Sequence, residues 1–423
     1  MRMRSASSLF SLMATVGVLA GVSCGVNSYG DDWPQFLGVH RDGVSKETGL
    51  VKKFGAKGPA VLWQTDLGVG MSGISVVGSQ VFTLYQDETS QYVVCLGVED
   101  GKITWKTAVG SAYENAMGNG PRATPSVSGD NVYALTGEGI LVALKRTDGM
   151  KLWEVNVPKS LGGEPSEYGM SGSPLVVEKH VIVHAGTESA AVAAFDAATG
   201  KLSWKAGSGK AGYSSPVLAE LSGVPQVLAF TATGITSVDP ASGTEFWSFP
   251  FITDYDCNTA NPVTTDDGHV LISAGENHGS VLLNIAKSGN KWTVKDEWTS
   301  AGKDSQLRAE WQTPVLHDGY LYGLDNSGSA GPITNLVCIR LSDRKTMWQK
   351  SRFGKSNLIL ADGMLWLTTM NGELVCVEAK SDDFFETGRA TVMETTRQAP
   401  AISNGRLFVR DDVRIICFDV KSP

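Results

Sequence analysis

Residues 93–105 read VVCLGVEDGKITW, and this phrase returns along the chain at nearly constant spacing. Each copy has a run of strand-forming residues, a polar turn that usually contains glycine, and a closing tryptophan. The closest copies are LVALKRTDGMKLW at 141–153, VAAFDAATGKLSW at 192–204, ITSVDPASGTEFW at 235–247 and LVCIRLSDRKTMW at 336–348. A repeat of roughly 40–50 residues built from strands predicts radial repetition, and therefore a β-propeller.

The phase of the repeat is set by a strand residue, usually small, that stands ten positions before the tryptophan. The regular copies place Cys95, Ala143, Ala194, Ser237 and Cys338 there. Three further copies are irregular. Leu283 is predicted to hold the position where an insertion delays Trp298, and Cys376 holds it where Phe384 and Phe385 stand near the missing tryptophan. Cys417 holds it in the last copy, where the chain ends.

The last copy lacks its outermost strand, and the N-terminal segment LWQTDLG around Trp63 supplies a strand of the right kind. We therefore expect the two ends of the chain to share one blade, which would close the ring and protect its sheet edges. The prediction is an all-β fold: an eight-bladed propeller of four-stranded antiparallel blades, with a composite last blade.

Composition and targeting signals limit the possible partners and the cellular location of the protein. The chain is 42% hydrophobic and contains 48 glycines, and its net charge of −8 argues against a nucleic-acid surface. Residues 1–30 resemble a signal peptide, with Arg2 and Arg4 before an apolar run from Leu9 to Ala20. The prediction is a periplasmic or secreted monomer with one propeller domain over 31–423 and no transmembrane segment in the mature chain. Lipid anchoring at Cys24 is an alternative, although Gly21 stands where a lipoprotein signal needs an aliphatic residue.

The cysteines do not predict disulfides, despite the export signal. Cys95, Cys338, Cys376 and Cys417 occupy one strand position in different blades, too far apart to pair. They are interpreted as small core residues. Cys257 lies outside this pattern, and we expect it as a free thiol near the channel.

The loops that precede the strand-initiating prolines are the candidate site. Six of the predicted blades open with a proline, so the loops before these prolines should share one rim around the channel mouth. The prolines are Pro125, Pro174, Pro216, Pro262, Pro314 and Pro400. The residues predicted to bind a ligand there are Glu114, Asn115, Arg122, Tyr168, Tyr213, Asp256, Asn258, Arg308, Trp311, Asn357 and Arg397. The same loops also contain Glu167, Tyr255, Asn261, Glu310, Lys355 and Gln398. We assign no catalytic and no metal-ligating residue.

Arginine, aromatic and carboxamide side chains in a funnel would suit an anionic, planar or sugar-like ligand. The alternative is structural: the same residues would hydrogen-bond neighbouring strand entries.

The repeats resemble the pyrroloquinoline-quinone-like propeller superfamily, whose members include quinoprotein alcohol dehydrogenases and an outer-membrane-assembly lipoprotein without cofactor. Residues 33–50, WPQFLGVHRDGVSKETGL, resemble the leader of exported propellers of this kind. For the enzymes, the resemblance implies pyrroloquinoline quinone (PQQ) and Ca²⁺, held by glutamate, asparagine and aspartate beside an arginine and a tryptophan. The matching residue types here are Glu114, Asn258, Asp256, Arg308 and Trp311. The adjacent cysteine pair of several such enzymes and a C-x-x-C-H haem motif are absent from the sequence.

Two functions remain open at this stage. The first is a non-catalytic binding or scaffolding propeller of the cell envelope, without a cofactor, that holds a protein, small molecule or glycan at the channel mouth. The alternative is a PQQ- and Ca²⁺-dependent dehydrogenase of an alcohol or sugar. The first is favoured because intact repeats stand beside missing enzyme motifs.

Overall fold

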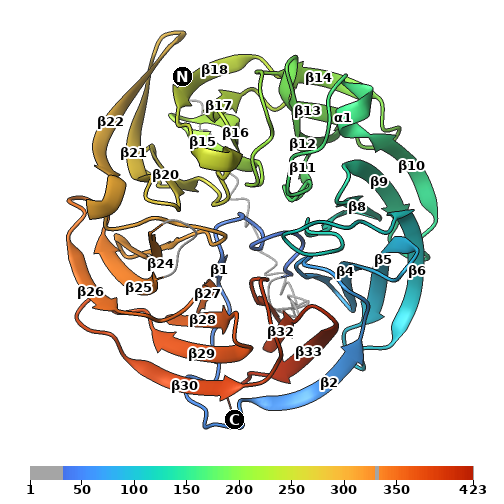
Figure 1. Ribbon diagram of the computed structural model, residues 1–423, viewed down its shortest axis with the longest axis vertical. Coiled ribbons are helices and arrows are strands. Elements are labelled where there is room, and N and C mark those ends of the chain that lie inside the picture. The colour runs from blue at the N-terminus through green and yellow to red at the C-terminus, as the bar shows by residue number, and fades with distance from the viewer. Residues whose placement is uncertain (1–31, 329–332, 423) are drawn as a thin grey trace, which may run out of the picture.

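The structure is a computed structural model that describes residues 32–328 and 333–422. The predicted signal peptide, the start at residue 31 and Cys24 lie outside these ranges. Figure 1 shows antiparallel sheets arranged in a ring around a central axis, as the repeat predicted. The sheet topology has eight such sheets, and the eight-bladed all-β propeller is confirmed.

The first four blades follow each other along the chain, each running from an innermost to an outermost strand. Blade 1 contains β3 (Ser75–Val77), β4 (Gln80–Gln86), β5 (Ser90–Gly97) and β6 (Ile103–Ser111). Blade 2 contains β7 (Ser126–Ser128), β8 (Asn131–Leu135), β9 (Ile140–Lys145) and β10 (Lys151–Asn156). Blade 3 contains β11 (Leu175–Val177), β12 (His180–Thr187), β13 (Ala190–Asp196) and β14 (Leu202–Ala206). Blade 4 contains β15 (Val217–Leu221), β16 (Val224–Thr231), β17 (Gly234–Val238) and β18 (Glu245–Pro250).

The remaining blades continue the ring. Blade 5 contains β19 (Val263–Thr264), β20 (His269–Ala274), β21 (Gly279–Ser288) and β22 (Lys291–Ala301). Blade 6 contains β23 (Val315–His317), β24 (Tyr320–Ser327), β25 (Ile333–Arg340) and β26 (Thr346–Lys350). Blade 7 contains β27 (Ser356–Ala361), β28 (Met364–Thr369), β29 (Glu373–Glu378) and β30 (Glu386–Thr391), with β1 (Val44–Ser45) added parallel to β27. Blade 8 contains β31 (Ala401–Ser403), β32 (Arg406–Arg410), β33 (Arg414–Asp419) and β2 (Ala60–Asp66). Short helices, α1 (Val157–Ser160), η1 (Asp254–Asp256) and η2 (Gly302–Asp304), lie in the loops.

Blade 8 confirms the predicted closure of the ring. Strand β2, from the N-terminal part of the chain, pairs antiparallel with β33 near the C-terminus. Trp63 lies opposite Cys417, and Thr65 lies opposite Ile415. Because β2 completes the blade that β31 to β33 begin, the ring closes through backbone hydrogen bonds between distant parts of the chain.

The repeated tryptophans join most blades to the next, although Trp247 of blade 4 donates to Gln226 of its own blade. The indole of Trp153 in blade 2 donates to the carbonyl of Ala197 in blade 3 at 3.0 Å. It also lies against Gly200, whose φ is +70° and whose Cβ, if present, would come within 2.7 Å of the ring. Any other residue would be strained there and would collide with the indole, which explains the glycine in the repeated phrase. Equivalent bonds run from Trp63 to Val98, Trp105 to Arg146, Trp204 to Pro240, Trp298 to Leu341 and Trp348 to Lys380.

Two irregular copies differ from the sequence prediction. In blade 5, Leu282 and not Leu283 lies opposite Trp298, because the hairpin of β21 and β22 is longer than in the regular blades and continues to the pair of Ser288 and Lys291. In blade 7, Gly388 lies opposite Cys376 where the other blades have tryptophan. The ring of Phe54 fills that space and stacks on Trp366 with ring centroids 6.2 Å apart. Phe384 instead packs on Trp348 of the neighbouring blade.

The segment before β2 enters the channel and turns back, and we call residues 32–50 the strap. Trp33 pairs antiparallel with Val76 of the innermost strand of blade 1, whereas Val44 pairs parallel with Leu360 of blade 7. The innermost strands run away from the rim loops. The strap therefore runs toward the rim along blade 1, where it is antiparallel, and away from the rim along blade 7, where it is parallel. In Figure 1 the blue strap lies at the centre of the ring.

Arg41 fixes the strap inside the channel. Its guanidinium is fully buried and donates to the Ser173 carbonyl at 2.9 Å, to the Pro216 carbonyl at 3.0 Å and to the Pro174 carbonyl. It also donates to the hydroxyl of Ser126 at 3.3 Å. These acceptors lie at or just before the innermost strands of blades 2, 3 and 4, so one side chain is hydrogen-bonded to three blades. Burial lowers the pKa of Arg41 to about 9, which leaves it charged at neutral pH.

Candidate functional site

The rim loops and the strap enclose one large cavity on the propeller axis, with a volume of about 470 Å³. Trp33, Phe36 and Leu37 of the strap line it at the base, and loops from the blades form its walls. The turn of the strap therefore lies against the cavity, inside the channel between blades 1 and 7. A volume of this size suits a small molecule or the end of a chain.

A belt of hydrogen bonds positions the rim loops. From blade 3 to blade 6, the residue before the blade-opening proline accepts, through its side chain, from the backbone N–H of its counterpart in the preceding blade. Thr124 N–H donates to Ser173 Oγ, Ser173 N–H to Ser215 Oγ, Ser215 N–H to Asn261 Oδ1 and Asn261 N–H to Thr313 Oγ1. The distances are 2.9–3.0 Å. The serine, asparagine or threonine before these four prolines therefore has a structural role.

The structure divides the predicted site residues into two groups. Those lining the cavity are Arg122, Tyr168, Tyr213, Trp311, Asn357 and Arg397. Those not lining it are Glu114, Asn115, Asp256, Asn258 and Arg308. From the wider set, Tyr255, Glu310, Lys355 and Gln398 also line it.

The residues outside the cavity have other contacts. Arg308 is buried and forms a two-pronged ion pair with Asp325, at 2.7 and 2.6 Å. Asn258 is buried and its amide donates to the carbonyls of Thr231 and Phe251.

The other three lie nearer the surface. Asp256 pairs with Lys210 at 2.6 Å, Asn115 donates to the Glu167 carbonyl at 2.9 Å, and Glu114 is exposed. Arg308 and Asn258 therefore fit the structural alternative, in which rim residues form hydrogen bonds within the fold and do not bind a ligand.

One wall of the cavity is cationic. Arg122 donates to the carbonyls of Gly120 and Gly118 at 2.6 and 2.7 Å, and its guanidinium lies over the Tyr113 ring. Arg397 donates to the Met117 carbonyl at 2.8 Å. Within the described part of the chain, neither guanidinium is paired with a carboxylate. Burial lowers the pKa of Arg122, and the charge of Arg397 lowers it further.

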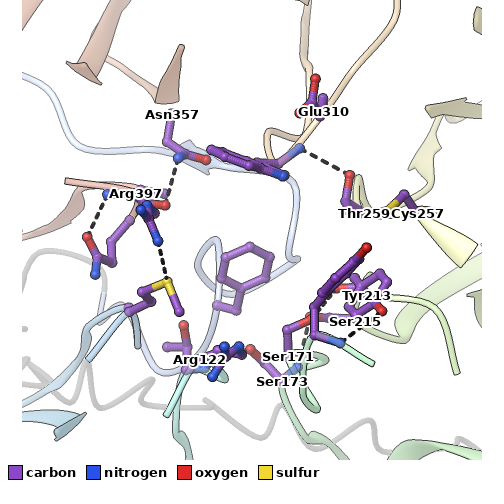
Figure 2. A pocket seen from close by; sticks show the side chains of 18 of the residues that line it. Arg122, Ser171, Ser173, Tyr213, Ser215, Cys257, Thr259, Glu310, Asn357 and Arg397 are labelled. Atoms are coloured by element: carbon purple, nitrogen blue, oxygen red, sulfur yellow. Dashed lines mark hydrogen bonds between the residues drawn. The ribbon is translucent and has the colours of Figure 1, made fainter. Parts of the chain in front are cut away.

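The facing wall is aromatic and acidic. Tyr168 and Tyr213 stack with ring centroids 5.7 Å apart. Lys355 lies over the Trp311 ring at 4.1 Å and pairs with Glu310 at 2.8 Å. Figure 2 shows this division, with Arg122 and Arg397 on one side of the cavity and Glu310 and Cys257 on the other.

The backbone of this second wall is strained. Positive φ angles between +52° and +67° occur at Tyr255, Asp256, Glu276, Asn277 and Trp311. Bulky residues rarely adopt this left-handed conformation, and such strain is concentrated at functional sites. The wall is therefore held in shape by the surrounding fold at a cost in energy.

Several cavity residues were not predicted as ligand-binding from the sequence. Trp33, Phe36 and Leu37 belong to the strap, and Met71 lies in the loop before blade 1. The blade-opening proline that marked most of the rim loops does not occur there. Cys257 was expected near the channel and does line the cavity as a free thiol, and burial raises its pKa to about 12.

The residues named for a quinone and calcium do not converge. Asp256 is paired with Lys210, Asn258 is buried outside the cavity, and Glu114 is exposed. Across residues 32–328 and 333–422, no three His, Cys, Asp or Glu side chains are grouped to hold a metal ion. This donor set therefore does not fit a calcium-bound quinone, which needs six or more oxygen ligands around the ion.

Comparison with known proteins agrees with the architecture. The model of the family described as outer membrane protein assembly factor BamB matches residues 47–162 and 114–350. The chain is similar to BamB of Yersinia pestis, 24% identical over 313 residues, which are 73% of this chain and 75% of that protein. BamB of Escherichia coli K12 is 25% identical over 312 residues, with the same two shares.

Solved structures show the same fold at low sequence identity. Quinohemoprotein alcohol dehydrogenase from Comamonas testosteroni superimposes with a TM-score of 0.66 at 14% identity, covering 92% of this chain and 80% of that one. BamB from Moraxella catarrhalis gives 0.57 at 14% identity, covering 84% and 99%. Among the described residues, no helix has the length and hydropathy to span a bilayer. The fold is the predicted PQQ-like propeller, and the chain belongs to the family of the outer membrane protein assembly factor BamB.

Proposed function

We propose that this protein is an exported, non-catalytic binding module of the cell envelope that takes part in outer membrane protein assembly. The observation that carries the proposal is the family match, which extends from residue 47 to residue 350. The relatives at 24–25% identity bear the name of an assembly factor. The rim cavity is the site at which this module holds its partner or ligand.

The arrangement of the rim supports binding more than catalysis. Its loops are fixed by the serine, threonine and asparagine belt, and its walls present separated cationic and acidic groups around aromatic rings. Such preformed, mostly apolar cavities with a few placed polar groups are typical of ligand sites. The dehydrogenase alternative has the shared fold as its support, and fold alone does not assign an activity.

The proposal also covers the export, the domain extent, the oligomeric state and the location of the protein in the cell. Residues 1–30 direct export, residues 31–423 form one propeller domain, and the mature protein is a periplasmic monomer. Lipid attachment at Cys24 would place it on a membrane surface without a spanning segment.

Affinity capture from the native envelope tests this function. The tagged protein is cross-linked in cells, purified from the envelope fraction and compared with a secreted, unrelated propeller that carries the same tag. We expect enrichment of proteins that insert β-barrels into the outer membrane, and slower accumulation of such barrels when the gene is deleted. Normal outer membrane composition in the deletion strain, with no such protein enriched, would contradict the proposal.

A further inference from the structure

The two walls of the cavity differ in whether their charged side chains form ion pairs. On the acidic wall, Glu310 is paired with Lys355. Burial, with the charges of Glu310 and Asp254, raises the pKa of Glu276. On the cationic wall, Arg122 and Arg397 donate only to uncharged groups in the described residues.

The lining as a whole is balanced in charge, since Asp254, Glu276 and Glu310 line the cavity together with Arg122, Arg397 and Lys355. The positive charge is nevertheless concentrated on one wall, because a guanidinium in a protein stays protonated and neither Arg122 nor Arg397 forms an ion pair with a described carboxylate. The natural complement of that wall is an anion.

The two guanidiniums are placed to act together. Arg122 holds the Gly118 and Gly120 carbonyls, and Arg397 holds the Met117 carbonyl of the same loop. Arg397 Nη1 lies 2.8 Å from the position that a Cβ on Gly118 would take, and the carbonyl of the same Gly118 accepts from Arg122, so the two guanidiniums meet at this residue. The Nε of Arg397 is buried and has no hydrogen-bond partner among the described residues. A two-oxygen anion would satisfy donors from both side chains.

The shape of the cavity restricts what can carry this anion. The strap occupies the channel between the innermost strands of blades 1 and 7 and lines the cavity with Phe36, which favours entry of a polypeptide by one of its ends. The lining beside the arginines is apolar, from Phe36, Met71 and Met117. Met side chains adapt to different apolar partners. The N-terminal end of a chain carries an ammonium, which the cationic wall would repel.

We propose that the rim cavity captures the C-terminal end of a polypeptide. The α-carboxylate binds Arg122 and Arg397, the last side chain is apolar and packs against Phe36 and Met71, and the preceding residues leave through the open rim. This is a known recognition mode in proteins, since a chain terminus is a feature that internal segments cannot imitate. The inference rests on the proposed binding function and names the chemistry of its partner.

Fluorescence polarisation with a matched pair of peptides tests the inference. Both are fluorescein-labelled octapeptides of glycine and serine that end in phenylalanine, one with a free carboxylate and one with a C-terminal amide. We expect the acid to bind about tenfold or more tightly than the amide, because hydrogen bonds to a charged acceptor are stronger than those to a neutral one. A third peptide that ends in aspartate should bind more weakly than the phenylalanine acid, because the lining beside the arginines is apolar.

Variants connect the binding to the cavity. Arg397→Gln should remove most of the preference for the acid, and Arg397→Lys should restore part of it. Lys201→Gln, which removes one positive charge from an exposed residue outside the cavity, is the matched control and should bind as the wild type does. Thermal unfolding of each variant shows that the fold is intact.

The outcomes separate this inference from the proposed function. Equal affinity for acid and amide, or an acid preference that survives Arg397→Gln in a folded variant, would overturn the inference. If neither peptide binds while assembly proteins are still captured from the envelope, the inference fails and the proposed function stands. If the acid binds selectively but the deletion strain has a normal outer membrane, the inference stands and the proposed function fails.

Discussion

Replacing Arg41 by methionine should loosen the strap and destabilise the whole propeller. Methionine keeps much of the volume and the flexible stem but removes every donor of the guanidinium. The Pro174 carbonyl also accepts from Ser126 Oγ, so the largest loss falls on the carbonyls of Ser173 and Pro216. Hydrogen bonds to a charged donor contribute about 1.5–3 kcal/mol each, and two of them amount to about 3–6 kcal/mol.

Part of this loss is offset because the variant no longer buries a charge, which costs several kcal/mol before its hydrogen bonds form. We therefore expect the free energy of unfolding to fall by about 2–4 kcal/mol. Equilibrium unfolding in guanidinium chloride measures this change. Lys46→Met is the control, since Lys46 lies on the same strap with an exposed side chain and should change stability by less than about 0.5 kcal/mol. If Arg41→Met unfolds at the wild-type midpoint, the strap does not hold the blades together as described.

Three further predictions concern the blades and the buried groups. Trp153→Ala should cost about 3–5 kcal/mol, because it removes a buried indole and its bond to blade 3, and a loss under about 1 kcal/mol in urea unfolding would contradict the packing. Arg308→Ala should lower the melting temperature strongly and cost about 3–5 kcal/mol, since it leaves Asp325 buried without its partner, and a nearly unchanged melting temperature would instead place Arg308 in contact with solvent. Burial, with a smaller effect from the Arg41 charge, lowers the pKa of His184 to about 3, so the unfolded chain takes up a proton below about pH 6.5 while the folded chain does not. Stability should then fall by about 1.4 kcal/mol per pH unit between pH 6 and pH 4, and urea midpoints for His184→Gln should show a smaller slope than the wild type.

The repeat predicted most of the fold because each blade must satisfy the same packing independently. The tryptophan, the glycine before it and the small strand residue mark the same contacts in most blades, as Trp153 and Gly200 illustrate. The register of Leu282 and the use of Phe54 in place of an indole were not predictable from the repeat. A lengthened hairpin hides the spacing between the strand residue and its tryptophan, and a ring supplied from a distant segment leaves no pattern in the blade that it completes.

The site was predicted only as a set of loops. Phase along the repeat places a loop on the rim but does not say which way its side chains point. Asn258 and Arg308 sit in the predicted loops and turn toward carbonyls and Asp325, whereas Arg122 and Arg397 from equivalent loops line the cavity. The strap lies outside the repeat altogether, so neither its place in the channel nor the buried Arg41 followed from the periodic pattern.

Titration of the purified protein with PQQ and Ca²⁺ tests most directly whether this propeller binds without catalysing a quinone reaction. The absorbance of the quinone and the reduction of a redox dye in the presence of alcohols and sugars are followed together. We expect no saturable binding of the quinone at micromolar concentrations and no dye reduction. Stoichiometric binding accompanied by turnover would contradict a non-catalytic function.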